Sequence, residues 1–259
     1  MFNGARRLRF QGLDLVVLPR AGEHRSQLDA QRDALLKLAT LARGWGSEEV
    51  PRMREVFKLE PFHRATSLVL VFDQGRLCGT GGVDANFAEC PPDVTILHLC
   101  SLNLLDEQKR TGLAALFMLL LGEELLAPLP AHRPVYFTSI SQSPLVYRLL
   151  TRLAKVYPDG RSTPPDDVRE VARVVAARYD PHIPLDADRL VLRNECDFFY
   201  RQVPYVADSR VNALFDSELD IAAGDVFVNV GKTDAGSARA AVERYRGRFP
   251  KMPEAHSDG

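Results

Sequence analysis

Cysteine is scarce in this chain: only four of its 259 residues are cysteine, at Cys78, Cys90, Cys100 and Cys196. No two of them form a Cys-x-x-Cys pair, so the sequence indicates neither a zinc site nor a disulfide framework. Cys78 and Cys100 lie within apolar runs, where a thiol behaves as a small buried hydrophobic group. Free thiols are typical of a reducing compartment, and we therefore expect a cytoplasmic protein without a bound metal.

Long apolar runs and an excess of charge of one sign are also missing. The N-terminus carries Arg6, Arg7 and Arg9 but no apolar stretch long enough for a signal peptide. The apolar run at residues 113–121 is too short to span a bilayer, which predicts a buried core helix and no membrane span. With 33 basic and 34 acidic side chains the net charge is −1. Nothing in this balance points to a nucleic acid as a partner.

What the sequence does have is a succession of strand-like and helix-like segments. Period-two apolar runs predict strands, and apolar residues three or four apart predict helices. In the first 158 residues we expect a strand at 13–18, a helix capped by Ser26, strands at 67–72, 76–86 and 95–105, a helix at 111–126, a strand at 135–140 and a helix from 143 to about 157. The glycines Gly79, Gly81 and Gly82 in the third of these strands indicate a bulge or a close approach by another element.

The last hundred residues follow a less regular pattern. Acidic residues at the start and Arg178 near the end predict a helix at 166–179. Strands are expected at 189–193 and 225–230. The intervening residues 194–224 form a long connection, and connections of that length usually carry function or a small structure of their own.

The most informative stretch is residues 99–126, in which the end of the strand at 95–105, a basic turn with one glycine and a long apolar helix follow one another. The amides in the first turn of a helix have no partner within the helix, and the helix dipole favours an anion there. Gly112 allows close approach of the backbone, and Lys109 and Arg110 add positive charge. The stretch therefore predicts a pyrophosphate site, although a simple tight connection between strand and helix has the same local pattern.

The order and lengths of the elements over residues 8–158 resemble the GNAT superfamily of acyl-CoA-dependent N-acetyltransferases. That family carries Gln/Arg-x-x-Gly-x-Gly/Ala where this chain has Lys109-Arg110-Thr111-Gly112-Leu113-Ala114. Lys109 departs from the first position of the pattern, and Asp106 stands where the family often has proline. The resemblance implies an α/β fold with a mixed, mostly antiparallel central sheet flanked by helices. It also implies one structural domain, with a core at 1–158 and an extension at 159–259 that completes the sheet and the acceptor pocket.

The resemblance further implies acetyl-CoA or another acyl-CoA as co-substrate. Its pyrophosphate would bind the turn and the start of the helix, and its pantetheine arm would bind the edge of the preceding strand. In the family this strand splays from its neighbour and leaves amides free for the arm, and Leu104 has the place of the amide that faces the thioester oxygen. The cofactor-binding residues implied are Leu102, Leu104, Lys109, Arg110, Thr111, Gly112, Leu113 and Ala114.

Acyl transfer to an amine also needs a base for the ammonium proton, and His98 is the leading candidate. Alternation along the strand places it on the same face as Cys100, Leu102 and Leu104, and imidazole titrates near neutrality. Aligned on the glycine turn, His98 coincides with the position where some GNAT proteins carry a catalytic glutamate. The competing interpretation is a histidine with a partner inside a half-buried sheet. Other candidate bases are Asp84, Glu60 and His63.

Tyr147 is the candidate acid for the leaving thiolate. It lies in the helix that starts at Ser143-Pro144, which resembles the family helix that supplies a tyrosine near the cofactor sulfur. The asparagine that the family has near the start of this helix is absent here. A tyrosine at this place can equally pack into the core of an amphipathic helix.

These features together predict an N-acyltransferase that moves an acetyl or longer acyl group directly to an amine, on a small molecule or a peptide, within a ternary complex. One alternative is a protein that binds acyl-CoA without turning it over, as a sensor. Another is an assembly protein on the same fold, in which the last hundred residues mediate contacts; the sequence leaves a homodimer open.

Overall fold

The computed structural model describes residues 2, 4–88, 91, 93–109, 111–247 and 249. The chain forms two compact units. Unit 1 comprises Met1–Asn86, Cys100–Ala127 and Val242–Gly259, and unit 2 comprises Phe87–Leu99 and Pro128–Ala241. The predicted division of a single domain at residue 158 stays a prediction.

The strands of unit 1 follow the spatial order β1 (Arg6–Phe10), β2 (Leu13–Pro19), β3 (Ser67–Asp73), β4 (Arg76–Asp84) and β5 (Thr95–Leu104), of which Cys100–Leu104 belongs to this unit. Neighbours from β1 to β4 are antiparallel. The hairpin turns have positive φ angles at both central residues, 50° and 82° at Gln11 and Gly12 and 48° and 81° at Gln74 and Gly75. Such turns match the right-handed twist of the strands that they join.

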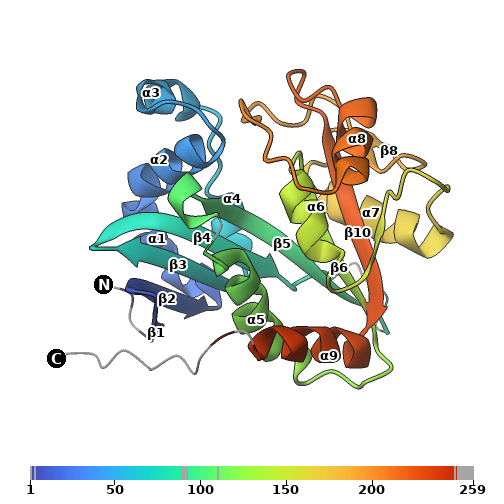
Figure 1. Ribbon diagram of the computed structural model, residues 1–259, viewed down its shortest axis with the longest axis horizontal. Coiled ribbons are helices and arrows are strands. Elements are labelled where there is room, and N and C mark those ends of the chain that lie inside the picture. Colours follow the sequence, from blue (N-terminus) through green and yellow to red (C-terminus); the bar gives the residue numbers. More distant parts are fainter. Residues whose placement is uncertain are drawn as a thin grey trace. The chain divides into compact units, whose positions relative to one another are not determined.

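Helices cover these strands on both faces (Figure 1). α5 (Leu113–Leu126) packs on β3 and β4, and α2 (Arg32–Ala42) packs on β4. Gly81 permits the approach of α5, because a Cβ atom at this position would lie only 2.4 Å from Cδ2 of Phe117. The pairing of β3 with β4 also shifts between Val71 and Phe72. The glycines of β4 therefore mark both a close approach and a bulge, as the sequence predicts.

Three short helices complete the N-terminal part of unit 1: α1 (Arg25–Ala30), α3 (Val50–Met53) and α4 (Glu60–Arg64). The prediction that Ser26 caps a helix is wrong. A 3-10 helix at Ala21–His24 leads directly into α1, so His24 takes the N-cap position and Ser26 lies inside the helix.

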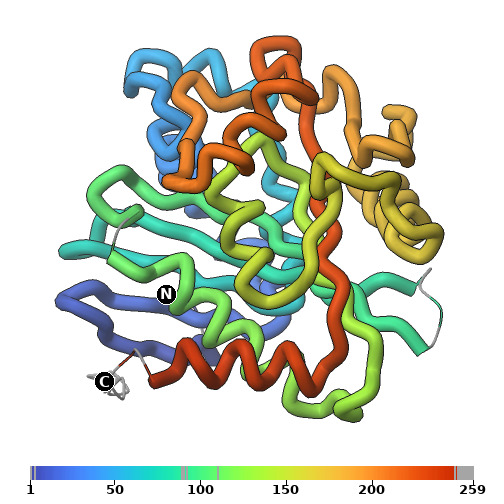
Figure 2. The backbone as a smooth tube through the Cα atoms, turned by 45° about the vertical axis from the view of Figure 1, so that its right-hand side comes forward, coloured from blue at the N-terminus to red at the C-terminus, as the bar shows by residue number. Residues whose placement is uncertain are grey.

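In unit 2 the strand order is β5, β6 (Pro134–Ser141), β10 (Val226–Asp234), β9 (Val191–Leu192) and β8 (Leu185–Asp186), and β7 (Lys155–Tyr157) also pairs with β10. β5 and β6 are parallel, whereas β10 is antiparallel to β6, β7 and β9. α7 (Asp166–Tyr179) buries Val168, Val171 and Val175 in a core shared with Val228 and Val230 of β10. In Figure 2, Pro128–Ala241 of this unit runs from yellow-green to red.

The long connection at residues 194–224 has a structure of its own, as predicted. It contains α8 (Ser209–Glu218), whose N-cap Asp208 accepts a hydrogen bond from the amide of Arg210. The carboxylate of Asp225 links the two ends of the connection: it accepts hydrogen bonds from the amides of Asn194 and Asp220 at 3.1 and 3.0 Å. α6 (Pro144–Leu150) ends earlier than the sequence predicts, because the chain turns there and enters β7.

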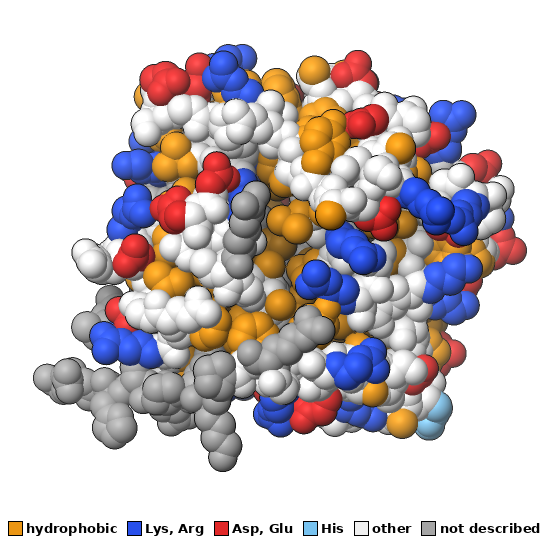
Figure 3. Space-filling model, in the orientation of Figure 1, with side chains coloured by type: hydrophobic (Ala, Val, Ile, Leu, Met, Phe, Trp, Pro, Cys, Tyr) orange, Lys and Arg blue, Asp and Glu red, His pale blue; other side chains and the backbone are white. Residues whose placement is uncertain are grey.

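The structure thus confirms the predicted class, an α/β fold with a mixed, mostly antiparallel sheet flanked by helices. α9 (Ala235–Arg246) follows β10 and ends the regular structure of the described chain. In the described ranges, no helix is both long and apolar enough to cross a membrane. Basic and acidic side chains are interspersed on the face shown in Figure 3.

Candidate functional site

A bulge in β5 determines which faces its side chains occupy. Ser101 has φ of 56°, a left-handed conformation that is rare within a strand. A Cβ at Gly82 would lie 3.2 Å from Sγ of Cys100, whereas a Cβ at Gly79 would lie 2.8 Å from Cδ2 of Leu104. Gly79 and Gly82 are three residues apart in a regular part of β4, so they point to opposite faces. The prediction that Cys100 and Leu104 share a face is therefore wrong, because the bulge inserts one residue between them.

The amide of Leu104 lies at one edge of β5. The next amide, that of Leu105, donates to the carbonyl oxygen of Cys78 in β4 at 3.2 Å. Because successive amides of a strand point to opposite edges, the Leu104 amide points away from β4. Within unit 2, the ladder between β5 and β6 runs from Thr95 to His98, with no further pair within the described residues.

The turn before α5 is built around Gly112. Its φ and ψ of 90° and 0° are readily adopted by glycine but strained for other residues, and it occupies the N-cap of α5. Its carbonyl accepts the first helical hydrogen bond, from the amide of Leu116 at 3.0 Å. The hydroxyl of Thr111 donates to the carbonyl of Gln108 at 2.8 Å and so closes the turn. The predicted arrangement of strand, glycine turn and helix N-terminus is present.

Lys109 was predicted to add positive charge to a pyrophosphate site, but its ammonium group is engaged within the protein. The ammonium of Lys109 donates to Asp106 at 2.6 Å and to the carbonyl of Ala42 at 3.1 Å, which ties the turn to the end of α2. Arg110 lies outside the described residues. The ring of Phe249 lies 3.6 Å from where a Cβ of Gly112 would be, an ordinary van der Waals distance.

His98 is buried in unit 2, with an exposed fraction of 3%. Its ring stacks on Tyr179 at 4.4 Å between centroids, and its Nδ1 lies 2.9 Å from the hydroxyl oxygen of Thr138. Burial, and secondly the charge of Arg178, lowers the pKa of His98 from 6.5 to about 3. The imidazole is therefore neutral at physiological pH, and these surroundings disfavour the predicted role as a base.

Tyr147 is also buried and engaged. Its hydroxyl donates to the carbonyl of Pro158 at 2.9 Å, and its ring lies edge-on to Phe215. Burial, followed by the charges of Asp159 and Asp208, raises the pKa of Tyr147 to about 12. A phenol with this pKa is a weaker acid than a free thiol, which disfavours proton transfer to a thiolate.

The other candidate bases lie in unit 1. Asp84 is fully buried and accepts the amide of Asn86 at 2.9 Å. His63 lies 3.0 Å from the carboxylate of Asp29. Glu60 forms an ion pair with Arg64 one helical turn away. Each of these groups has a local partner that accounts for its position.

The buried polar network around the bulge of β5 is not predicted from the sequence. Asn103 is 5% exposed, and its amide nitrogen lies within hydrogen-bond distance of the Ser101 carbonyl and the Thr80 hydroxyl. Its side-chain oxygen accepts a bond of 2.7 Å from the guanidinium of Arg43. The signal available in the sequence was an asparagine between two leucines of an otherwise apolar strand.

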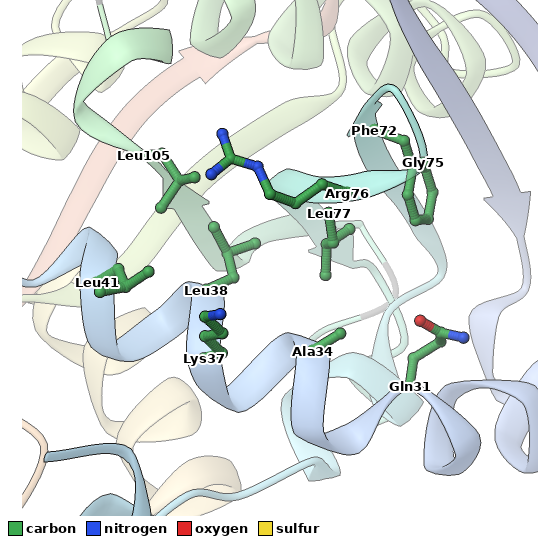
Figure 4. Close-up of a pocket in the computed structure, with 10 residues that line it drawn as sticks. All are labelled: Gln31, Ala34, Lys37, Leu38, Leu41, Phe72, Gly75, Arg76, Leu77 and Leu105. Carbon is green, nitrogen blue, oxygen red and sulfur yellow. The ribbon is translucent and has the colours of Figure 1, made fainter. Parts of the chain in front are cut away.

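Unit 1 also holds a cavity of about 220 Å3 between α2 and the hairpin of β3 and β4 (Figure 4). Leu38 and Leu41 of α2 face Leu77 of β4 and Leu105 across it. The other lining residues are Gln31, Ala34, Lys37, Phe72, Gly75 and Arg76. Arg76 is paired with Glu107 at 2.8 Å. The cavity is thus mainly apolar, with its charged groups at the rim.

No protein-family model and no curated protein matches this chain. Among solved structures, a provisionally assigned acetyltransferase is similar over 96% of this chain and all of its own, with 14% identity and a TM-score of 0.41. The GNAT-family acetyltransferase of Streptococcus pneumoniae is similar over 56% of this chain and 89% of its own, with 14% identity and a TM-score of 0.31. The GCN5-related N-acetyltransferase of Kribbella flavida is similar over 96% and 66%, with 14% identity and a TM-score of 0.34.

Proposed function

We propose that this protein binds an acyl-CoA and transfers its acyl group to an amine. The observation that carries the proposal is the glycine turn between β5 and α5, in which Gly112 has a backbone conformation suited to glycine at the N-terminus of an apolar helix. The first-turn amides and the helix dipole suit the pyrophosphate of coenzyme A. The amide of Leu104, at the edge of β5 away from β4, suits the pantetheine arm.

In the proposed reaction the amine nitrogen attacks the thioester carbon, and a tetrahedral intermediate with a negatively charged oxygen forms. Backbone amides of β5 donate hydrogen bonds to this oxygen. The carbon–sulfur bond then breaks, and the thiolate leaves and takes up a proton. Because His98 and Tyr147 are both buried and engaged, we propose that water takes the ammonium proton and that solvent protonates the thiolate.

Binding without turnover is the second candidate, and the same two residues favour it. A protein that only senses acyl-CoA needs the turn and the strand edge but no proton-transfer groups. In the described structure His98 stacks on Tyr179, and Tyr147 is bonded to the carbonyl of Pro158. Both side chains then act only in the packing of unit 2.

Release of free thiol from acetyl-CoA, measured with a panel of small amines and peptides, tests the proposal. We expect at least one amine to raise thiol release above the rate with acetyl-CoA alone. Gly112→Trp should abolish the amine-dependent thiol release, because the indole would fill the approach to the turn and residue 112 would be strained at a positive φ. Gly75→Trp is the matched control: Gly75 has a similar φ of 81° in an open hairpin. Tight binding without thiol release for any amine would favour the sensor, and equal effects of the two substitutions would refute the site.

A further inference from the structure

The carbonyl group of Ser101 is held by two side chains at the bulge of β5. The hydroxyl of Thr80 donates to this oxygen at 2.6 Å, and the amide nitrogen of Asn103 donates to it at 3.1 Å. Asn103 is fixed in turn by Arg43, whose guanidinium bonds its side-chain oxygen at 2.7 Å and the carbonyl of Ala39 in α2 at 3.2 Å. We call these three side chains, of Arg43, Thr80 and Asn103, the bulge latch.

The bulge latch stabilises a strained backbone. A serine with φ of 56° in a strand is unfavourable, and such conformations persist only when their surroundings hold them. Thr80 has no exposed surface and Asn103 is 5% exposed, so their hydrogen bonds are shielded from water. Strained residues of this kind gather at binding and catalytic sites, which makes the direction of the neighbouring amides informative.

The latch determines where the amide of Leu102 points. The peptide group between Ser101 and Leu102 is planar, with its carbonyl and its N–H on opposite sides. Because the carbonyl is held toward Thr80 of β4, the N–H of Leu102 points away from β4, as the N–H of Leu104 does. Two donors two residues apart along β5 therefore share an orientation.

We infer that Thr80 and Asn103 are positioning residues that direct the Leu102 amide at the carbonyl oxygen of a bound acyl group. This inference depends on the proposed function, because it assigns a donor within the proposed site. It adds a donor to the one expected at Leu104. An amide that is fixed before the substrate binds needs no further ordering, so less free energy is lost on binding. A hydrogen-bond donor also stabilises a developing oxyanion most strongly when it is already held in position.

The test compares the affinities for acetyl-CoA and for free coenzyme A, measured by isothermal titration. Thr80→Val removes the hydroxyl at nearly constant volume, and Asn103→Asp removes the donor to Ser101 while keeping an acceptor for Arg43. Only acetyl-CoA carries the thioester carbonyl oxygen. We therefore expect each variant to weaken the binding of acetyl-CoA about three- to tenfold relative to that of coenzyme A, as the loss of one hydrogen bond implies. A purely structural role would weaken both ligands equally.

Thr40→Val is the matched control, because Thr40 carries a fully buried hydroxyl in α2 that donates to the carbonyl of Leu36 at 2.8 Å. The backbone carbonyl of Thr40 accepts the amide of Arg43, and this bond is kept when the side chain is changed. Its affinity ratio should equal that of the wild type. Hydrogen exchange at the Leu102 amide gives an independent readout, and it should accelerate in Thr80→Val. An unchanged affinity ratio in both latch variants would overturn the inference. If the wild type bound neither ligand, the proposed function would fail, and faster exchange at Leu102 would then show that the latch is only structural.

Discussion

His98 should contribute to the pH dependence of the free energy of unfolding, and a comparison with a variant that lacks the imidazole separates this contribution from those of other groups. Its pKa is lowered from 6.5 to about 3 in the folded chain, first by burial and then by Arg178. Below pH 6.5 the unfolded chain takes up a proton on this imidazole, whereas the folded chain does not until the pH approaches 3. The free energy of unfolding therefore falls as the pH is lowered through this window, and it is fully retained above pH 6.5.

The magnitude follows from the two pKa values. Each unit of separation corresponds to about 1.4 kcal/mol, so lowering the pH from 7.5 to 4.5 should cost about 2.6 kcal/mol through His98 alone. Substitution by glutamine removes the titration and retains a group that can bond the hydroxyl of Thr138. Carboxylates elsewhere titrate in both proteins and cancel in the difference between them.

Urea unfolding of the wild type and of His98→Gln at pH 7.5, 6.5, 5.5 and 4.5 measures this difference. We expect the difference in unfolding free energy between the two proteins to shift in favour of the variant by about 2.6 kcal/mol across the series. Parallel pH profiles would show that the imidazole titrates normally in the folded chain. That result would refute the buried, neutral state of His98 and would restore it as a candidate base.

Three further predictions concern packing and hydrogen bonds. Tyr147→Phe should lower the free energy of unfolding by about 1 kcal/mol, through the lost bond to Pro158, and should change turnover less than threefold; a larger loss of turnover at unchanged binding would restore its role as an acid. Gly81→Ala should cost about 1 to 3 kcal/mol in urea unfolding, because its Cβ would lie 2.4 Å from the ring of Phe117, and Phe117→Leu in the same chain should recover part of this loss; additive losses would contradict the clash. Asp225→Ala should cost about 2 kcal/mol or more, because two backbone amides and a guanidinium lose their acceptor; a change below about 0.5 kcal/mol would show that the connection is held by other contacts.

Local signals in the sequence, namely apolar periodicity, charged residues at helix ends and turn residues, predicted much of the fold. α7 was predicted with its observed bounds, because its acidic first turn and basic last turn frame a clear helical period. The hairpin at Gln74 and Gly75 followed from a turn signal between two apolar strands. The short strands β7 and β8 were missed, because a strand of two or three residues has no measurable period.

The candidate site was predicted less completely, for a local reason. The glycine turn follows from residue types, and it is present at Gly112. The bulge at Ser101 does not follow from residue types, because serine has no intrinsic preference for a positive φ. Its conformation depends on Thr80, which is distant in sequence, and on Asn103, which lies within an apolar run. Once one residue is inserted, alternation assigns every later side chain to the wrong face. The burial of His98 likewise depends on Tyr179, which lies 81 residues further along the chain.

Titration calorimetry with acetyl-CoA measures whether the turn at Gly112 binds the pyrophosphate of an acyl-CoA. We expect one site of micromolar affinity in the wild type and in the control Gly75→Trp, and a loss of affinity of at least tenfold in Gly112→Trp. If the wild type bound neither acetyl-CoA nor longer acyl-CoAs, or if binding were unchanged in Gly112→Trp, the turn would not be the pyrophosphate site.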